Sequence, residues 1–284
     1  MSGFSIDWLN LREDADRRAR DPQLSRLARQ WLGSEIATAG LINDDPVVVD
    51  LGAGTGSTLR ALTSSADHDP VSATWHLVDH DPVLLAEARR RHGGTHNLIT
   101  SQADLADVDR LPLDRARLIT ASALFDLVSA SFLDALTARL QARCLASPCG
   151  LYATLNYDGT TDWTPAHPLD QVVLAAFNRD QQRDKGFGRA LGPDAADYLE
   201  HSFLKAGFAV SRGSSPWQLD DSDDRLISEL IRGISHAVAG DAQLDASALE
   251  DWTRFRLSTV TSGTCRVGHT DLFIVPGQRT AQDS

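Results

Sequence analysis

Short apolar runs alternate with amphipathic segments through the first half of the chain. A β-branched run at 47–51 is closed by glycines, as is typical of a buried parallel strand. Further strands are predicted at 74–79, 97–104, 116–124 and 150–157. Helices are predicted between them at 57–65, at 81–92 and along the apolar stripe Leu133, Leu136, Leu140 and Cys144. Strands that alternate with helices favour a parallel sheet covered on both faces.

The two ends of the chain depart from this alternation. Before the first strand, apolar residues at helical spacing predict a helix that follows Asp21-Pro22 and ends near Gly40. After Asp158 the pattern breaks into polar, Gly- and Pro-containing loops around one helix, which indicates an insertion up to Pro193. The rest of the chain predicts a helix at 194–207, a strand with a Ser-Pro break at 208–219, a helix around 226–234, a helix at 248–260 and a strand at 265–276.

Composition and charge exclude several classes of function. The 284 residues have 42% hydrophobic content, which is enough for one large domain without disulfides. A formal net charge of -12 disfavours binding to nucleic acid or to an anionic membrane surface. The N-terminus lacks a signal pattern and no apolar run approaches the ~20 residues of a spanning helix, so a cytoplasmic protein is expected. The three cysteines and the scattered histidines have no ligand spacing, and no metal site is expected.

The stretch Asp-Leu-Gly-Ala-Gly-Thr-Gly at 50–56 is the strongest chemical signal. Its three glycines allow a sharp turn and a close approach of backbone N–H groups to a ligand. The spacing is not the dinucleotide fingerprint G-x-G-x-x-G, and no Lys-Ser/Thr pair follows as in a phosphate-binding loop. Asp50 would repel a pyrophosphate but suits a cationic amino or sulfonium group, and Asp79 is placed to accept ribose hydroxyls. An adenosine with a cationic end indicates S-adenosylmethionine.

Residues 47–156 resemble the core of the class I (Rossmann-like) S-adenosylmethionine-dependent methyltransferases. The matching pieces are "VVDLGAGTG", "HLVDHDPVLLAEAR", "SQADL" and "LITASALFDLVS", in family-like order and spacing. The resemblance implies an α/β fold with a doubly wound, mostly parallel seven-stranded sheet whose last strand is antiparallel. It also implies pairing of 208–213 with 265–276, and helical additions at the N-terminus, between strands five and six, and between strands six and seven.

The same resemblance implies the residues of the cofactor site. Asp50 and the glycines would contact the methionine part, with Ala121 and Ser122 near its end. Asp79 would bind the ribose, and Asp104 with Leu105 would flank the adenine, beside His80. The predicted set is Asp50, Gly52, Ala53, Gly54, Gly56, Asp79, His80, Asp104, Leu105, Ala121 and Ser122. Two simpler roles stay open: Asp104 could cap a turn, and Asp81 is expected to cap the helix at 81–92 rather than bind ligand.

The acceptor is expected to be a small molecule, because the exit of the fourth strand lacks the Asn/Asp-Pro-Pro-Tyr/Phe tetrad of nucleic-acid amino-methyltransferases. Asp126, Asn156 and Tyr157 follow the fourth and fifth strands, on the edge where open α/β sheets bind ligands. Around two glycines, the segment 177–193 carries Arg183, Lys185 and Arg189 in an otherwise acidic chain. This segment predicts a pocket wall for an anionic acceptor. A solvated helix end is the alternative for this segment. For Arg12 and Asp16, the alternative to a place in the site is an exposed i,i+4 ion pair.

The domain organisation expected from these features is an N-terminal helical cap at 1–40 and one methyltransferase domain at 41–284. Within that domain, 41–157 would hold the cofactor, an insertion at about 158–193 would bind the acceptor, and 194–276 would supply the last strands and helices. We expect an enzyme that transfers a methyl group in line to a small-molecule acceptor. Two alternatives stay open: an enzyme that uses the same cofactor for other chemistry, and a non-catalytic S-adenosylmethionine-binding regulator.

Overall fold

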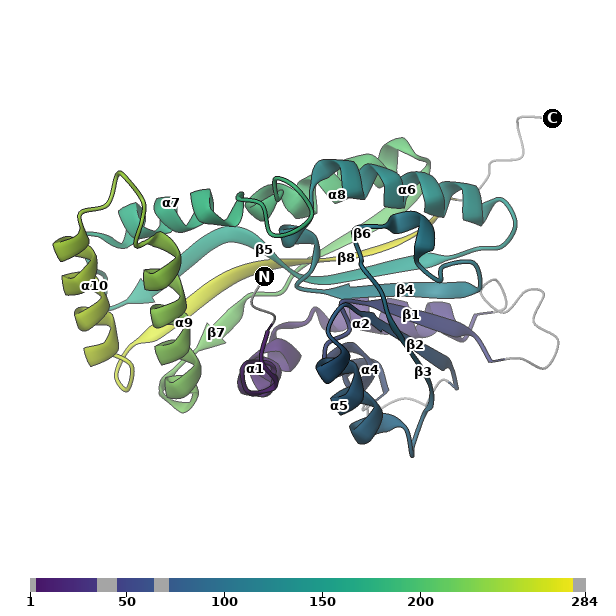
Figure 1. Cartoon of the computed structure of the whole chain (residues 1–284), viewed down its shortest axis with the longest axis horizontal. Coiled ribbons are helices and arrows are strands. Elements are labelled where there is room, and N and C mark those ends of the chain that lie inside the picture. Colours follow the sequence, from purple (N-terminus) through teal and green to yellow (C-terminus); the bar gives the residue numbers. More distant parts are fainter. Residues whose placement is uncertain (1–3, 35–44, 64–71, 278–284) are drawn as a thin grey trace.

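A computed structural model describes residues 4–34, 45–63 and 72–277, which form an α/β sheet with helices on both faces (Figure 1). The strands are β1 (Val47–Leu51), β2 (Thr74–Asp79), β3 (Asn97–Gln102), β4 (Ala116–Ser122), β5 (Gly150–Thr164), β6 (Phe208–Ser214), β7 (Trp217–Leu219) and β8 (Thr264–Pro276). The helices are α1 (Ile6–Ala19), α2 (Pro22–Leu32), α4 (Ser57–Thr63), α5 (Pro82–His92), α6 (Ala130–Cys144), α7 (Asp170–Gln181), α8 (Ala195–Lys205), α9 (Asp224–Val238) and α10 (Ala246–Ser258).

The sheet confirms the fold expected from the sequence. Its order is β3-β2-β1-β4-β5-β8-β6, and β1 to β5 are parallel to their neighbours within that set. β8 lies between β5 and β6 and is antiparallel to both. The structure has one strand more than the seven expected, because the Ser215-Pro216 break separates β6 from β7, which also pairs with β8. This is the Rossmann-like arrangement that the resemblance implied.

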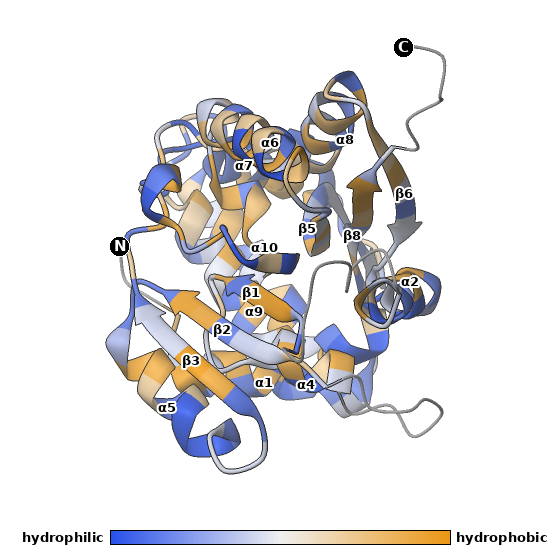
Figure 2. Cartoon of the chain, turned by 90° about the vertical axis from the view of Figure 1, so that its right-hand side faces the viewer, coloured by the Kyte–Doolittle hydropathy of each residue, from blue (hydrophilic) through white to orange (hydrophobic). Residues whose placement is uncertain are grey.

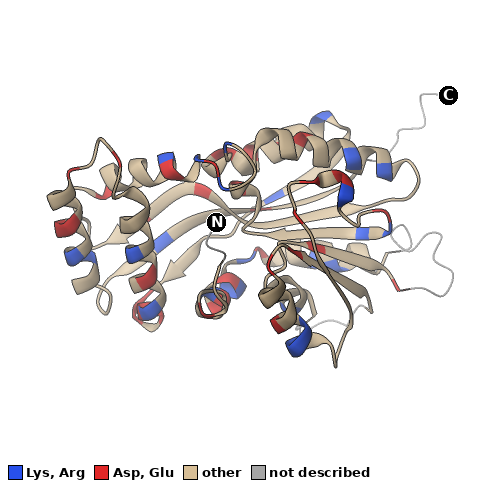
Figure 3. Cartoon of the chain, viewed as in Figure 1, with Lys and Arg blue, Asp and Glu red and all other residues tan. Residues whose placement is uncertain are grey.

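Two hydrophobic cores fix helices to the two faces of this sheet. One core joins α6 and α8 to Leu272 and Ile274 of β8, and the other joins α2, α4 and α5 to Phe273 of the same strand. The alternation along β8 follows from the two-residue repeat of a strand, which points successive side chains to opposite faces. Figure 2 shows the hydrophobic strands between these helix layers. Charged residues lie mainly on the helices and loops (Figure 3).

A third core lies beyond the main sheet. Asn156–Thr164 of β5 pairs with Thr264–Thr270 of β8, and we call this pair, with β7, the strand extension. Residues of α1, α7, α9 and α10 pack on it around Trp217, Val267 and Trp252. α1 lies between this third core and the β1–β3 side of the sheet (Figure 1).

Two expected boundaries are wrong. α2 ends at Leu32 and is followed by Gly33 at its C-cap, well before Gly40, which lies outside the described residues. β5 continues to Thr164, so the chain does not leave the sheet at Asp158 as expected. It stays extended because β8 pairs with it as far as Thr164 opposite Thr264. Among the described helices, none has both the length and the apolar character needed to span a bilayer.

Candidate functional site

The glycine loop connects the end of β1 to α4 at the carboxyl edge of the sheet. Gly52, Gly54 and Gly56 have φ angles of 64°, 53° and 84°, in the left-handed region that favours glycine. At Gly54 the space is also limited, since a Cβ would lie 3.1 Å from Leu9 of α1. The loop therefore keeps its backbone bare of side chains, and α1 covers it.

Asp50 lies on the strand just before this loop and is 1% exposed. Its Oδ1 accepts a 2.6 Å hydrogen bond from the Thr120 hydroxyl of β4, the residue paired with it in the sheet. Its Oδ2 is buried and makes no hydrogen bond of normal geometry with a described residue, although the nearby Thr58 hydroxyl lowers the pKa of Asp50. Burial raises the pKa of Asp50 to about 7. A buried carboxylate with one free oxygen is well suited to a cationic ligand group.

Asp79, at the end of β2, ties the loop to the neighbouring strand. Its Oδ2 accepts a 2.8 Å bond from the Gly54 N–H, and its Oδ1 accepts a 3.0 Å bond from the Asp81 N–H. The carboxylate is 4% exposed, and the half-exposed His80 ring has its Nδ1 3.2 Å from Asp79 Oδ1. Asp81 itself caps α5 by accepting from the Val83 N–H, as expected from the sequence. The structure thus brings Asp50, Asp79 and the glycine loop together.

The predicted adenine-side residues divide between the surface and the core. Asp104 is exposed and accepts a 3.0 Å bond from the Ala106 N–H, which is the turn-capping role left open above. Leu105 is buried, and a Cβ on Gly52 would lie 3.8 Å from it and 3.4 Å from Leu124. Leu105 therefore lies against the glycine loop, whereas the Asp104 carboxylate points to solvent.

Arg20 joins the site from the chain just after α1, and no sequence pattern predicted this role. It is 7% exposed, and its guanidinium donates to the Thr154 hydroxyl at 2.6 Å and to the Ser122 hydroxyl at 3.1 Å. Its charge lowers the pKa of Asp50, although less than burial raises it. The predicted Ser122 thus holds a buried guanidinium close to Asp50. Of the other predicted residues, Ala53 is buried within the loop, and Ala121 is buried on β4.

The carboxyl edge also holds two strained residues. Among the described residues, Ala123 and Leu155 are the non-glycine residues with positive φ, at 50° and 56°. The Ala123 N–H donates to the Thr154 carbonyl at 2.9 Å, and the Leu155 N–H donates to Asp271 Oδ1 at 2.7 Å. Such conformations persist where the surrounding bonds determine them, and they concentrate at functional sites.

The acceptor-side residues on strands are buried. Tyr157 donates its hydroxyl hydrogen to Asn178 Oδ1 at 2.9 Å, and burial raises its pKa. Asn156 donates to the Thr270 carbonyl at 2.9 Å, while its buried Oδ1 has no partner among the described residues. Asp126, in the 3₁₀ turn Phe125–Leu127 after β4, also has a buried Oδ1 without a partner in the described part of the chain. These unpaired atoms lie at the edge where β4 and β5 leave the main sheet.

The predicted basic segment only partly reaches this edge. The Lys185 ammonium lies 2.8 Å from Asp180 Oδ2, yet its charge still lowers the pKa of Asp126. Arg183 is exposed and lies 3.7 Å from Asp180, and Arg189 is exposed in a β-bridge with Asp184. The structure therefore brings Lys185 toward Asp126 and leaves both arginines at the surface.

Arg12 and Asp16 form the i,i+4 pair considered above, but the pair is buried rather than exposed. Their side chains are 11% and 9% exposed, with Arg12 Nε 2.8 Å from Asp16 Oδ2. The Trp217 indole donates to Asp16 Oδ1 at 2.9 Å, and the Arg12 guanidinium lies 5.0 Å from the Trp217 ring. α1 is thus packed on the strand extension by a charged pair whose polar atoms are satisfied.

Comparisons with known proteins find likeness only among solved structures. No protein-family model and no curated protein matches the chain. A cyclopropane synthase from Mycobacterium tuberculosis is 13% identical, with a TM-score of 0.49 over 96% of this chain and 94% of that one. The YcgJ protein from Bacillus subtilis is 16% identical, with a TM-score of 0.46 over 88% and 99%. A geranyl diphosphate C-methyltransferase from Streptomyces coelicolor A3(2) is 10% identical, with a TM-score of 0.40 over 89% and 80%. Likeness at this level does not establish an activity, which depends on the residues of the site.

Proposed function

We propose that the protein is an S-adenosylmethionine-dependent methyltransferase that acts on a small-molecule acceptor. The observation that carries this proposal is Asp50: a buried carboxylate with one unpaired oxygen, at the start of a loop of three left-handed glycines. An unpaired buried carboxylate oxygen destabilises a protein unless a ligand compensates for it. A cationic group on the ligand compensates best.

The other residues of the site fit S-adenosylmethionine. Asp50 faces the cationic end, and the Arg20 guanidinium beside it suits the carboxylate of the same amino acid. Asp79, at the end of β2, would accept the ribose hydroxyls, and His80 beside it and Leu105 against the glycine loop would contact the adenine. A Cβ on the glycines would narrow the space that the loop leaves open.

Bound S-adenosylmethionine supplies a methyl group on a positively charged sulfur, open to attack by a nucleophile. The protein's part is to hold donor and acceptor in line and to exclude water. Asp50 and Arg20 fix the amino-acid end, Asp79 fixes the ribose, and α1 covers the loop with Leu9 against Gly54. In this proposal residues 41–157, together with Arg20, hold the cofactor, and later elements with α1 recognise the acceptor.

The acceptor side favours a molecule that is anionic when the methyl group is transferred. Arg12 and Lys185 each pair with a carboxylate, yet both lie close enough to Asp126 for their charges to lower its pKa, and they would also stabilise a negative oxygen there. Arg183 and Arg189 are exposed, and neither is among the charges that shift the pKa of Asp126. The negative charge of the acceptor is therefore better assigned to a deprotonated oxygen within the site than to a carboxylate or phosphate held by the basic segment.

Calorimetric titration with S-adenosylmethionine, with NAD as the control ligand, tests the proposal. We expect micromolar binding of S-adenosylmethionine and none of NAD, followed by S-adenosylhomocysteine production once a suitable acceptor is added. A folded protein that binds neither ligand would contradict the proposed function. Binding without turnover on any acceptor would favour the non-catalytic regulator.

A further inference from the structure

Two buried side chains near the proposed donor site have polar atoms without partners. Asp126 is 8% exposed and His269, on β8, is 6% exposed. Asp126 Oδ1 and His269 Nδ1 make no hydrogen bond within the described part of the chain. An unpaired buried polar group destabilises the folded protein. Such atoms are expected where a ligand supplies the missing partner.

Asp126 and His269 lie near the same elements, which are α1, β5, β8 and the loop after α7. The Arg12 charge, from α1, lowers the pKa of Asp126 and also that of His269. The charge of Asp126 raises the pKa of Tyr157, whose ring centre is 6.3 Å from that of His269. Lys185 approaches Asp126 from the loop after α7. The residues that carry the unpaired atoms therefore lie around the junction between the exit of β4, the strand extension and α1.

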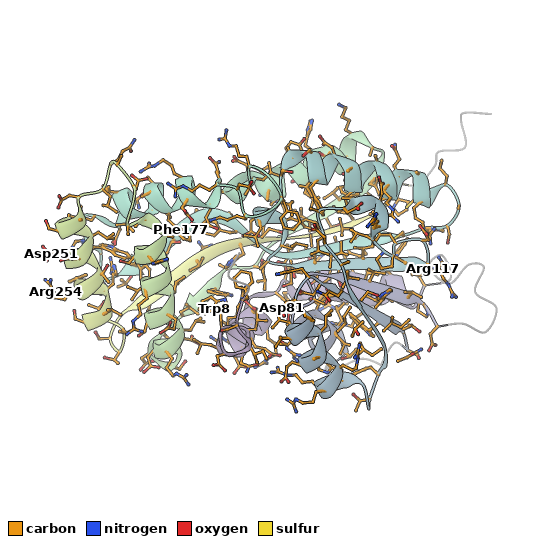
Figure 4. The ribbon with its side chains drawn as sticks, in the orientation of Figure 1. Trp8, Asp81, Arg117, Phe177, Asp251 and Arg254 are labelled. Carbon is orange, nitrogen blue, oxygen red and sulfur yellow. The ribbon has the colours of Figure 1, made fainter. Side chains whose placement is uncertain are left out.

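Aromatic rings form the walls of this junction. The Trp217 ring is 5.3 Å from His269, and the Phe177 ring of α7 is 5.8 Å from Tyr157. Figure 4 shows Phe177 beside the strand extension. The rings of Trp217, Tyr157 and Phe177 therefore lie around His269 and suit a flat aromatic acceptor.

We infer that Asp126 is the general base for methyl transfer to a hydroxyl group on an aromatic acceptor bound at this junction. The inference rests on the proposed function, because it requires the methyl donor. The acceptor O–H bond breaks and its proton goes to Asp126 Oδ1. The oxygen forms the new bond to the methyl carbon, while the bond from that carbon to sulfur breaks and leaves its electron pair on sulfur. Arg12 and Lys185 stabilise the oxygen as its negative charge develops.

The electrostatics of Asp126 suit this role. Burial raises its pKa to about 6, against the opposing effect of Arg12 and Lys185. At pH 7 to 8 the carboxylate is then ionised, yet close to the pH at which it accepts a proton. His269, whose pKa burial lowers to about 3, is neutral at that pH and can share a hydrogen bond with the acceptor without competing as a cation.

The test compares Asp126→Asn with the wild type on phenol, catechol and 2-naphthol, using naphthalene and acetate as matched compounds without an aromatic hydroxyl. S-adenosylhomocysteine production and quenching of tryptophan fluorescence are measured from pH 5 to 9. We expect binding and methylation of at least one hydroxylated ring, and neither for naphthalene or acetate. Asp126→Asn should lower kcat by about 100-fold or more, and the acidic limb of the wild-type pH profile near pH 6 should disappear.

Asp251→Asn is the control, because Asp251 is an exposed carboxylate on α10 that pairs with Arg254 one turn along the same helix (Figure 4). Calorimetry with S-adenosylmethionine separates this inference from the proposed function, since cofactor binding should be equal in all three proteins. The inference is overturned if the cofactor binds but no hydroxylated ring is bound or methylated, or if Asp126→Asn retains the wild-type kcat. Loss of cofactor binding in the wild type would instead overturn the proposed function.

Discussion

The β1–β4 region and the strand extension are held together in different ways. In the first region, neighbouring strand ends and the loop that follows β1 hold each other, as in the bonds from Gly54 to Asp79 and from Thr120 to Asp50. In the second, side chains far apart in sequence meet: Trp217 binds Asp16, and Arg256 binds Asp170. The first region owes its geometry to the sheet and one short motif. The second depends on specific long-range polar contacts, which makes it the more sensitive to single substitutions.

The largest effect is expected at Arg256. This side chain is 1% exposed, pairs with Asp170, donates to the Pro165 carbonyl at 2.6 Å and lies over the Trp163 ring. Arg256→Ala leaves the Asp170 carboxylate buried without its cation, so the free energy of unfolding should fall by about 3–5 kcal/mol. Urea denaturation measures it. Arg254→Ala, which removes an exposed pair with Asp251, should change it by less than about 1 kcal/mol. Equal effects of the two substitutions would contradict the claim that buried long-range contacts stabilise the strand extension.

Asp79→Ala should have the next largest effect, and on binding more than on stability. It removes the group placed for the ribose and the bond to Gly54, so the affinity for S-adenosylmethionine should fall by about 1–3 kcal/mol. Calorimetry measures this change, with Asp134→Asn as control because Asp134 bonds to the Tyr198 hydroxyl at the surface of α6. Unchanged affinity in Asp79→Ala would mean that the ribose lies elsewhere.

The pH dependence of cofactor binding tests Asp50. Its pKa is about 7 in the folded protein, so the carboxylate is ionised above that pH and neutral below it. A cationic ligand prefers the ionised form, and the affinity for S-adenosylmethionine should fall by up to about tenfold per pH unit below pH 7. Asp50→Asn should bind weakly at every pH and show no such slope.

The raised pKa of Asp50 also predicts how the stability of the ligand-free protein depends on pH, and here the effect has the opposite sign. A raised carboxyl pKa stabilises the folded state below the unfolded pKa, and this contribution is lost as the pH rises through about 7. Asp50→Asn should therefore unfold at higher temperature than the wild type at pH 8 and show less difference at pH 4. A wild type that is the more stable protein at pH 8 would contradict the burial of an unpaired charge.

The smallest effect is expected at Arg18, which pairs with Asp223 at 2.7 Å and is 45% exposed. Arg18→Ala removes one contact that holds α1 to the region before α9, and should change the free energy of unfolding by at most about 1 kcal/mol. If it lowered stability as much as Arg256→Ala, exposed contacts and not buried ones would hold the second region.

The sequence predicted the first region well because its signals are local. The glycine spacing, Asp50 and Asp79 all lie at strand ends, and parallel strands bring such ends to one edge. Asp81 was correctly predicted as a helix cap, since the capping bond joins it to Val83 only two residues away. These predictions required no knowledge of which distant segments meet.

The second region could not be predicted in the same way. The burial of Arg12 and Asp16 depends on Trp217, which is 201 positions from Asp16. The length of β5 depends on its pairing with β8, and the place of Arg20 depends on Thr154. In each case the local sequence also allows an exposed residue or a shorter strand, so only the tertiary fold determines the outcome.

Hydrogen–deuterium exchange with and without S-adenosylmethionine tests the central claim most directly, namely that the cofactor binds at the glycine loop. We predict slower exchange in peptides that cover 50–56 and 79–81 and in α1, with little change in α10. Protection confined to α9, α10 and the strand extension, or no protection at a saturating concentration, would contradict the account.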